Sequence, residues 1–143
     1  MKSIDPYLHF MGNTSDAMNF YKSVFGGDFI TFQRYKDVPG GEKMPAKAQA
    51  QIVHASLPVG KHNTIMATDT ADTMEQTVVM GTNFHLCVHT ESESEADNLF
   101  EALSKEGKVE MPMNKTFWGA YFGMCMDKFG IQWMISYDNQ NPK

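Results

Sequence analysis

Apolar side chains recur at two spacings in the first half of the chain, and each spacing predicts an element. Residues 6–11 are typical of a short strand, and residues 12–16, rich in helix-capping side chains, predict the start of a helix. The apolar positions that follow at helical spacing are Ala17, Phe20, Tyr21, Val24 and Phe25. Gly26 and Gly27 can adopt the left-handed conformation that ends a helix. Further strands are predicted at 29–35, 50–57 and 63–68.

Two connections in this half have turn chemistry. Residues 38–45 contain Pro and Gly throughout and predict a mobile surface loop, of the kind that often covers a site. Residues 58–61 form a four-residue, hairpin-like link between two strands. Residues 69–81 show little periodicity and predict a linker.

The second half repeats the order of the first. Residues 83–89 alternate between apolar and other side chains, which predicts a strand with Phe84, Leu86 and Val88 on one face. Ser92 and Glu95 have the spacing of a capping box and predict a helix start. The apolar stripe of this helix is Ala96, Leu99, Phe100 and Leu103. Gly107 ends it, and three strands are predicted from 109 to 137.

Each half therefore reads as a strand, a helix and three strands, which indicates an internal duplication. The predicted fold class is α+β, with two tandem βαβββ modules and mainly antiparallel sheets. We predict a single domain over 1–143, built of module 4–70 and module 82–138 joined by a linker at 71–81.

Composition excludes several classes of protein. The chain has 143 residues, a net charge of −5 and a pI near 5.4, without the basic patch that nucleic acids or acidic membranes require. No run approaches the roughly 18 apolar residues of a membrane span, and the N-terminus has no apolar leader segment. Neither Cys87 nor Cys125 lies in a CxxC spacing, so no disulfide framework or zinc knot is predicted. We expect a soluble, cytoplasmic protein with no nucleic-acid or membrane partner.

Three short segments carry a resemblance to a known family. They are Phe20-Tyr21 with Val24-Phe25-Gly26, Thr116-Phe117-Trp118, and Asp127-Lys128-Phe129-Gly130 with Trp133-Met134-Ile135. In these segments the chain resembles the PhnB-like family of the vicinal oxygen chelate superfamily, which includes glyoxalases, bleomycin resistance proteins and dioxygenases. The resemblance implies that two modules place their sheets around a concave cavity with a helix on each convex side. It also implies a homodimer.

Enzymes of this superfamily usually hold a divalent metal on the concave face, with ligands from the first and last strands of each module. By this resemblance the ligand positions fall on Pro6, Met66, Asn83 and Met134. A proline side chain cannot bind a metal, thioethers are poor ligands for hard divalent ions, and one amide alone does not hold a metal. We therefore predict no metal and no cofactor.

Histidines are the other candidate functional groups. His85 shares a predicted strand face with Asn83 and Cys87, which points it into the cavity as a proton carrier or hydrogen-bond anchor. The alternative is a half-buried polar strand residue. His54 could join it, but the sequence leaves its facing open. Counting from the helix motif places His9 on the helix side of the first strand, with Leu8 and Phe10 facing the cavity.

The predicted pocket combines an apolar wall with scattered polar contacts, as small-molecule sites do. Its candidate residues are Phe10, His54, Met66, Asn83, His85, Phe117, Trp118, Tyr121, Gln132 and Met134. Trp118 and Tyr121 could instead be core or dimer-interface residues. Trp133 should pack under a helix, opposite Met134, because strand neighbours alternate.

We expect a metal-free protein that binds a small, partly apolar molecule in the cavity between its modules. The alternative is a lyase, isomerase or dioxygenase that uses noncanonical ligands such as His54 and His85, or metal-free acid–base chemistry. A demethylubiquinone methyltransferase label is attached to this family by name. Methyl transfer is less expected, because the sequence shows no nucleotide-binding unit with a glycine-rich loop.

Overall fold

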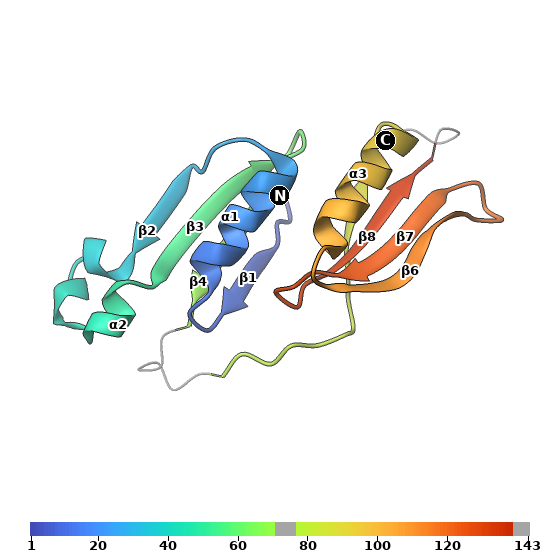
Figure 1. Ribbon diagram of the computed structural model, residues 1–143. Coiled ribbons are helices and arrows are strands. Elements are labelled where there is room, and N and C mark those ends of the chain that lie inside the picture. Colours follow the sequence, from blue (N-terminus) through green and yellow to red (C-terminus); the bar gives the residue numbers. More distant parts are fainter. Residues whose placement is uncertain (71–76, 139–143) are drawn as a thin grey trace. The chain divides into compact units, whose positions relative to one another are not determined.

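The computed structural model describes residues 1–70 and 77–138 (Figure 1). The chain divides into two compact units, Met1–Val79 and Met80–Lys143, which we call module 1 and module 2 and describe separately. Of the predicted linker 71–81, residues 71–76 lie outside the described part of the chain.

The described residues of module 1 form four strands, one long helix and three short helical turns. Its elements are β1 (Tyr7–Phe10), α1 (Thr14–Phe25), β2 (Thr31–Arg34), η1 (Tyr35–Asp37), η2 (Gly41–Lys43), α2 (Ala46–Gln49), β3 (Ile52–Val59) and β4 (Asn63–Asp69). The helix predicted after residues 12–16 is confirmed, and it ends at Gly26, whose φ of 79° lies in the left-handed region.

Module 2 has the same order of main elements. They are β5 (Leu86–His89), α3 (Glu93–Ser104), β6 (Lys108–Lys115), β7 (Tyr121–Met126) and β8 (Gln132–Tyr137). The predicted helix start at Ser92 is confirmed, because the Ser92 hydroxyl accepts a hydrogen bond from the Glu95 amide at 3.0 Å. The Glu95 carboxylate accepts in return from the amide of Glu91 at 2.9 Å. The predicted strand 83–89 begins only at Leu86.

The two sheets share one topology, which confirms the predicted α+β fold of two βαβββ modules. Their strand orders are β1-β4-β3-β2 and β5-β8-β7-β6. In each sheet the first strand pairs in parallel with the last, and the remaining pairs are antiparallel. Each sheet is therefore mixed and mainly antiparallel.

In module 1, α1 covers one face of the sheet and leaves the other without a helix. The covered face is marked by Asp69, whose carboxylate accepts a hydrogen bond from the amide of Thr14, the first residue of α1. Strand pairing places Leu8 beside Ala67 and Phe10 beside Asp69, and all four residues are buried. Because side chains alternate, Tyr7 and His9 lie on the opposite face, the helix-free face of module 1.

In module 2, α3 packs on the face that carries Gly123, Cys125 and Trp133. A Cβ atom at Gly123 would come within 2.6 Å of the Met113 sulfur and 2.9 Å of the Phe100 ring of α3, so a larger residue would have to displace these side chains. Trp133 is buried, as predicted, and Met134 lies on the other side of the strand. That side is the helix-free face of module 2.

Residues 38–45, predicted to be a mobile surface loop, include a helical turn. They contain η2, and α2 follows directly. Gly41 is buried, and a Cβ atom there would overlap the carbonyl group of Tyr35. The sequence indicates a turn residue at this glycine, whereas the structure uses it for close packing.

Candidate functional site

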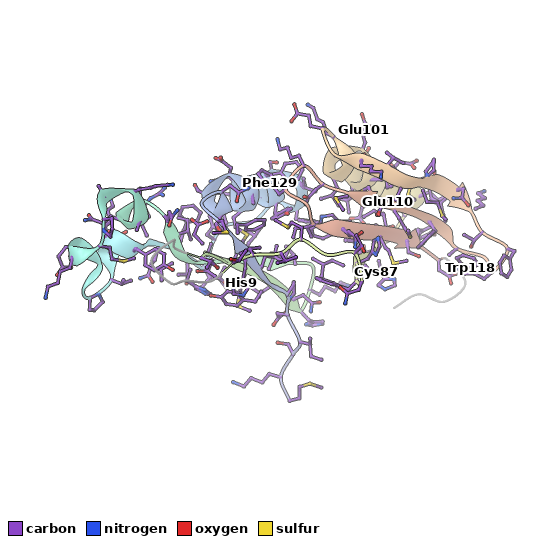
Figure 2. All side chains as sticks on the ribbon, turned by 90° about the horizontal axis from the view of Figure 1, so that it is seen from below. His9, Cys87, Glu101, Glu110, Trp118 and Phe129 are labelled. Atoms are coloured by element: carbon purple, nitrogen blue, oxygen red, sulfur yellow. The ribbon has the colours of Figure 1, made fainter. Side chains whose placement is uncertain are left out.

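On the helix-free face of module 1, Tyr7 lies between two histidines. Its hydroxyl is 2.9 Å from Nδ1 of His54, and its ring centroid lies 5.4 Å from that of His9. Figure 2 shows His9 on the side of its sheet that lies away from α1. Burial raises the pKa of Tyr7, with a smaller contribution from Tyr35, so the hydroxyl stays protonated.

Met66 belongs to the same helix-free face. It pairs with Tyr7 on one side and with Ser56 on the other. Residues paired in this way share a face of the sheet, so Tyr7, His54 and Met66 form one surface of mixed polarity. The facing of His54, which the sequence left open, is therefore settled.

The helix-free face of module 2 is rich in sulfur. Met134 of β8 pairs with Cys87 of β5 and with Met124 of β7. Figure 2 shows Cys87 on the side of its sheet that lies away from α3. This face therefore presents soft, flexible side chains rather than branched apolar ones.

A histidine and a carboxylate bridge this face. Nε2 of His85 lies 3.0 Å from Oε1 of Glu110, and the two side chains are 18% and 23% exposed. His85 precedes β5 and Glu110 belongs to β6, and these two strands are the opposite edges of the sheet. Since α3 covers the other face, the pair reaches over the central strands β7 and β8 on the helix-free side.

Beside the His85–Glu110 pair, the side-chain amide of Gln132 makes a hydrogen bond to the backbone. Its Nε2 donates to the carbonyl oxygen of Phe84 at 2.7 Å, and the Gln132 side chain is buried. Asn83 and Phe84 precede β5 and are exposed. Gln132 thus fixes the approach of the chain to β5 and holds His85 near the face.

Aromatic rings gather at the hairpin between β6 and β7. The Phe117 and Trp118 rings are 5.0 Å apart, and Trp118 lies 6.0 Å from Phe122. The Thr116 hydroxyl donates to the Ala120 carbonyl and accepts from the Ala120 amide, which closes the turn. Phe117 is 98% exposed and Trp118 57% exposed, so the hairpin presents apolar surface to solvent.

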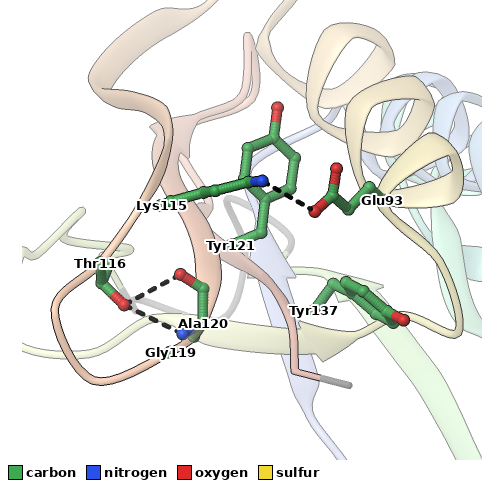
Figure 3. A pocket seen from close by; sticks show the side chains of 7 residues that line it. All are labelled: Glu93, Lys115, Thr116, Gly119, Ala120, Tyr121 and Tyr137. Carbon is green, nitrogen blue, oxygen red and sulfur yellow. Dashed lines mark hydrogen bonds and ion pairs between the residues drawn. The ribbon is translucent and has the colours of Figure 1, made fainter. Parts of the chain in front are cut away.

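A small cavity of about 210 Å³ lies between this hairpin and the start of α3 (Figure 3). It is lined by Glu93, Lys115, Thr116, Gly119, Ala120, Tyr121 and Tyr137. An exposed ion pair, 3.9 Å between Lys115 Nζ and Glu93 Oε1, crosses it. Small-molecule pockets usually measure roughly 300–1,000 Å³, so this cavity is small for a substrate.

The predicted facing of β1 is wrong. Leu8 and Phe10 lie on the helix-covered face and are buried, whereas His9 lies on the helix-free face. The expectation rested on counting back from the helix motif, and the irregular residues between β1 and α1 do not preserve the strand parity. Phe10 is therefore a core residue.

Tyr121 also differs from the expectation. Its hydroxyl donates to the Asp97 carboxylate of α3 at 2.6 Å, so its ring lies on the helix-covered side of the sheet. Phe122, its neighbour, is the residue that meets Trp118. The hydrogen bond to Asp97, followed by burial, raises the pKa of Tyr121. Tyr121 and Trp118 thus lie on different surfaces.

The residues present do not fit the divalent metal that the superfamily resemblance implies. Met66 and Met134 offer only thioethers, which bind hard ions poorly, and Pro6 offers no side-chain donor. Within residues 1–70 and 77–138, no three His, Cys, Asp or Glu side chains are grouped as metal ligands. We therefore derive no chemical step through such a metal.

The two cysteines differ sharply in accessibility. Cys87 is exposed, whereas Cys125 is buried and its pKa is raised to about 12, mainly by burial and then by the charges of Asp127 and Glu110. We expect iodoacetamide to label Cys87 in the native protein and Cys125 only after unfolding, because the thiolate is the nucleophile. Peptide mass spectrometry checks this. Labelling of Cys125 at a comparable rate in native protein would contradict the packing of module 2.

Among the described residues, no helix is both long and apolar enough to cross a membrane. A family model described as 3-demethylubiquinone-9 3-methyltransferase matches residues 2–136. The chain is 30% identical to the protein YjdN of Escherichia coli (strain K12), over 97% of each chain.

Solved structures agree with this match. Protein PA1353 from Pseudomonas aeruginosa is 34% identical, with a TM-score of 0.83 over 95% of this chain and 97% of that one. A PhnB protein from Bacillus cereus, described as a putative 3-demethylubiquinone-9 3-methyltransferase, is 26% identical, with a TM-score of 0.75 over 94% and 98%. A glyoxalase/bleomycin resistance protein/dioxygenase family enzyme from Burkholderia phytofirmans PsJN shares the fold at 18% identity, with a TM-score of 0.59 over 92% and 95%. The chain therefore belongs to the PhnB-like family, whose model carries the 3-demethylubiquinone-9 3-methyltransferase description, and it shares the fold of glyoxalase/bleomycin resistance/dioxygenase proteins.

Proposed function

We propose that this protein binds a small, partly apolar organic molecule on the helix-free face of module 2. The observation that carries the proposal is the pair of His85 and Glu110, 3.0 Å apart and largely shielded from solvent. A polar pair on an otherwise apolar face is the usual composition of a small-molecule site. Binding of this kind requires no divalent metal.

The thioethers of Met124 and Met134 would supply the apolar part of the site. Methionine has three rotatable bonds and a polarisable sulfur, so the surface can adapt to different ligand shapes. Glu110 engages Nε2 of His85, which fixes the imidazole ring and directs Nδ1 to a ligand. The ligand class that fits is a compact molecule with an apolar body and one hydrogen-bonding group.

The same pair favours a second candidate function, proton transfer in a lyase or isomerase reaction. A histidine oriented by a carboxylate is a recurring arrangement for a general base. In this reading His85 would remove a proton from the bound molecule and Glu110 would stabilise the imidazolium that forms. Recovery of a changed product after incubation distinguishes this reaction from binding alone.

Methyl transfer, which the family description names, has weaker support. A common type of methyltransferase uses a doubly wound parallel sheet with a glycine-rich phosphate loop. Each sheet of this protein contains one parallel pair and two antiparallel pairs. We therefore do not propose that activity.

The test is thermal melting with a panel of small aromatic and aliphatic acids, alcohols and amides. A ligand present at 100 times its dissociation constant should stabilise the protein by about 2.7 kcal/mol. We expect His85→Ala to weaken binding of the compounds found by at least about tenfold, because a hydrogen bond from a half-buried imidazole to the ligand is lost. His62→Ala, in an exposed turn of module 1, is the control and should leave binding unchanged.

Two results would reject the proposal. One is a panel in which no compound raises the melting temperature of the wild-type protein. The other is a set of compounds that bind the His85→Ala and His62→Ala variants as well as they bind the wild type.

A further inference from the structure

A row of sulfur atoms crosses the helix-free face of module 2. Cys87 of β5 pairs with Met134 of β8, Met134 pairs with Met124 of β7, and Met124 pairs with Met111 of the edge strand β6. The four residues therefore occupy one lateral row, one from each strand of the sheet.

The spacing of this row suits shared binding of one ion. Neighbouring strands lie roughly 4.7–4.9 Å apart, and paired side chains on one face point the same way. A methionine side chain is long and flexible enough to move its sulfur across that distance toward a neighbour. Two thioethers and one thiol can thus converge without a change in the backbone.

The chemistry of these donors selects the kind of ion. Thioether and thiolate sulfurs are soft ligands that prefer Cu(I), whereas Mg²⁺, Ca²⁺ and Mn²⁺ prefer oxygen donors. The sulfur donors that make this face unsuited to a hard divalent metal therefore favour a soft monovalent metal ion. Glu110, the nearby carboxylate, is engaged by His85 at 3.0 Å.

Access to the row is open at both ends. Cys87 and Met111 are exposed, while Met124 and Met134 in the middle are half-buried. The other cysteine of module 2, Cys125, lies on the helix-covered face and is buried. It cannot contribute to the row.

We propose that the row is a binding site for one Cu(I) ion, held by the sulfurs of Cys87, Met124 and Met134, with Met111 at its rim. In the binding step the Cys87 thiol releases its proton to solvent as the copper–thiolate bond forms, and both thioethers bind through lone pairs without a change in oxidation state. This site shares Met124 and Met134 with the proposed organic-ligand site, but the inference does not require that an organic molecule binds there.

The experiment is an anaerobic titration of the full chain against the coloured Cu(I) complex of bicinchoninate. We expect the wild-type protein to remove one equivalent of copper from this complex. Cys87→Ser, Met124→Leu and Met134→Leu should each weaken the affinity at least about tenfold, because loss of supporting contacts alone weakens metal sites by that factor. Met11→Leu replaces an exposed methionine of module 1 and should bind copper as the wild type does.

Leucine is close in volume to methionine, so the variants should keep the fold, and thermal melts of the metal-free proteins verify this. Sulfur coordination should appear in the copper X-ray absorption spectrum of the loaded protein. Copper that stays with bicinchoninate, or row variants that bind it as tightly as Met11→Leu, would overturn the proposal.

Discussion

Replacing Asp127 by alanine is expected to destabilise module 2 by about 3–5 kcal/mol. The Asp127 carboxylate, whose residue is 2% exposed, accepts hydrogen bonds from the Phe129 amide at 2.8 Å, the Ile131 amide at 3.1 Å and the Trp133 indole at 2.8 Å. Each buried donor that loses its partner costs about 1–3 kcal/mol. Urea denaturation followed by circular dichroism measures the loss, and hydrogen exchange should show reduced protection of the Phe129 and Ile131 amides.

Two variants make this prediction specific. Asp28→Ala removes a carboxylate that is 96% exposed and pairs with Lys22, so the cost should stay below about 1 kcal/mol. Asp127→Asn places an amide NH₂ against the Trp133 indole N–H, so two donors face each other. We therefore expect Asp127→Asn to lower the free energy of unfolding less in a Trp133→Phe background, where the indole donor is absent. An Asp127→Ala protein as stable as Asp28→Ala would show that this network does not hold the turn.

The second large effect is expected for Asp69→Ala in module 1, also about 3–5 kcal/mol. One oxygen of the Asp69 carboxylate accepts hydrogen bonds from the amides of Gly12 and Thr14 at 2.9 and 3.0 Å. The other oxygen accepts a hydrogen bond from the Ile52 amide at 2.8 Å. Asp69 thus joins the last strand, the start of α1 and the start of β3. Its removal leaves buried amides without a partner. The measurement is again the free energy of unfolding in urea.

Asp16→Ala is the matched control for Asp69. Asp16 lies in the first turn of α1 but is exposed, so its loss removes only the interaction with the helix dipole, about 0.3–1 kcal/mol. If Asp69→Ala and Asp16→Ala had equal effects, the carboxylate of Asp69 would act only as a nearby charge and not as a hydrogen-bond acceptor.

The order of elements could be predicted because its signals are local. The helical spacing of apolar residues before Gly26 and the capping box at Ser92 each depend on neighbours within a few positions. The role of Asp69 depends on residues that are 17, 55 and 57 positions away. Asn13 is the N-cap residue of α1 and belongs to residues 12–16, but its side chain makes no capping hydrogen bond.

For β1, the family resemblance gave the wrong buried face, although the pattern of side chains within the strand indicates the correct one. Tyr7 and His9 are polar, and Leu8 and Phe10 are apolar, so the alternation within the strand itself indicates the correct buried face. Counting from the helix motif reversed this assignment. In module 2, the alternation of residues 86–88 by itself indicates that Cys87 faces away from Leu86 and Val88. The strand pairing agrees with this facing.

The candidate site was accessible from sequence only in part. Alternation identified His85, and the family resemblance identified Met134, but Glu110 lies 25 residues from His85 and on the far edge of the sheet. The sulfur row likewise depends on the register of four strands, and β6 carries two register irregularities that no pattern in the sequence indicates. Side-chain contacts that depend on the pairing register of the strands can therefore be identified only from the structure.

The most direct test of ligand binding on module 2 is NMR of the protein labelled with ¹³C at the methionine methyl groups. The methyl groups of Met124 and Met134 report on the helix-free face, and Met18, buried in module 1, is an internal control. With a compound that raises the melting temperature, we expect shifts of the Met124 and Met134 methyl signals in the wild-type protein that are much weaker in His85→Ala. Shifts confined to module 1, or unchanged by His85→Ala, would contradict it.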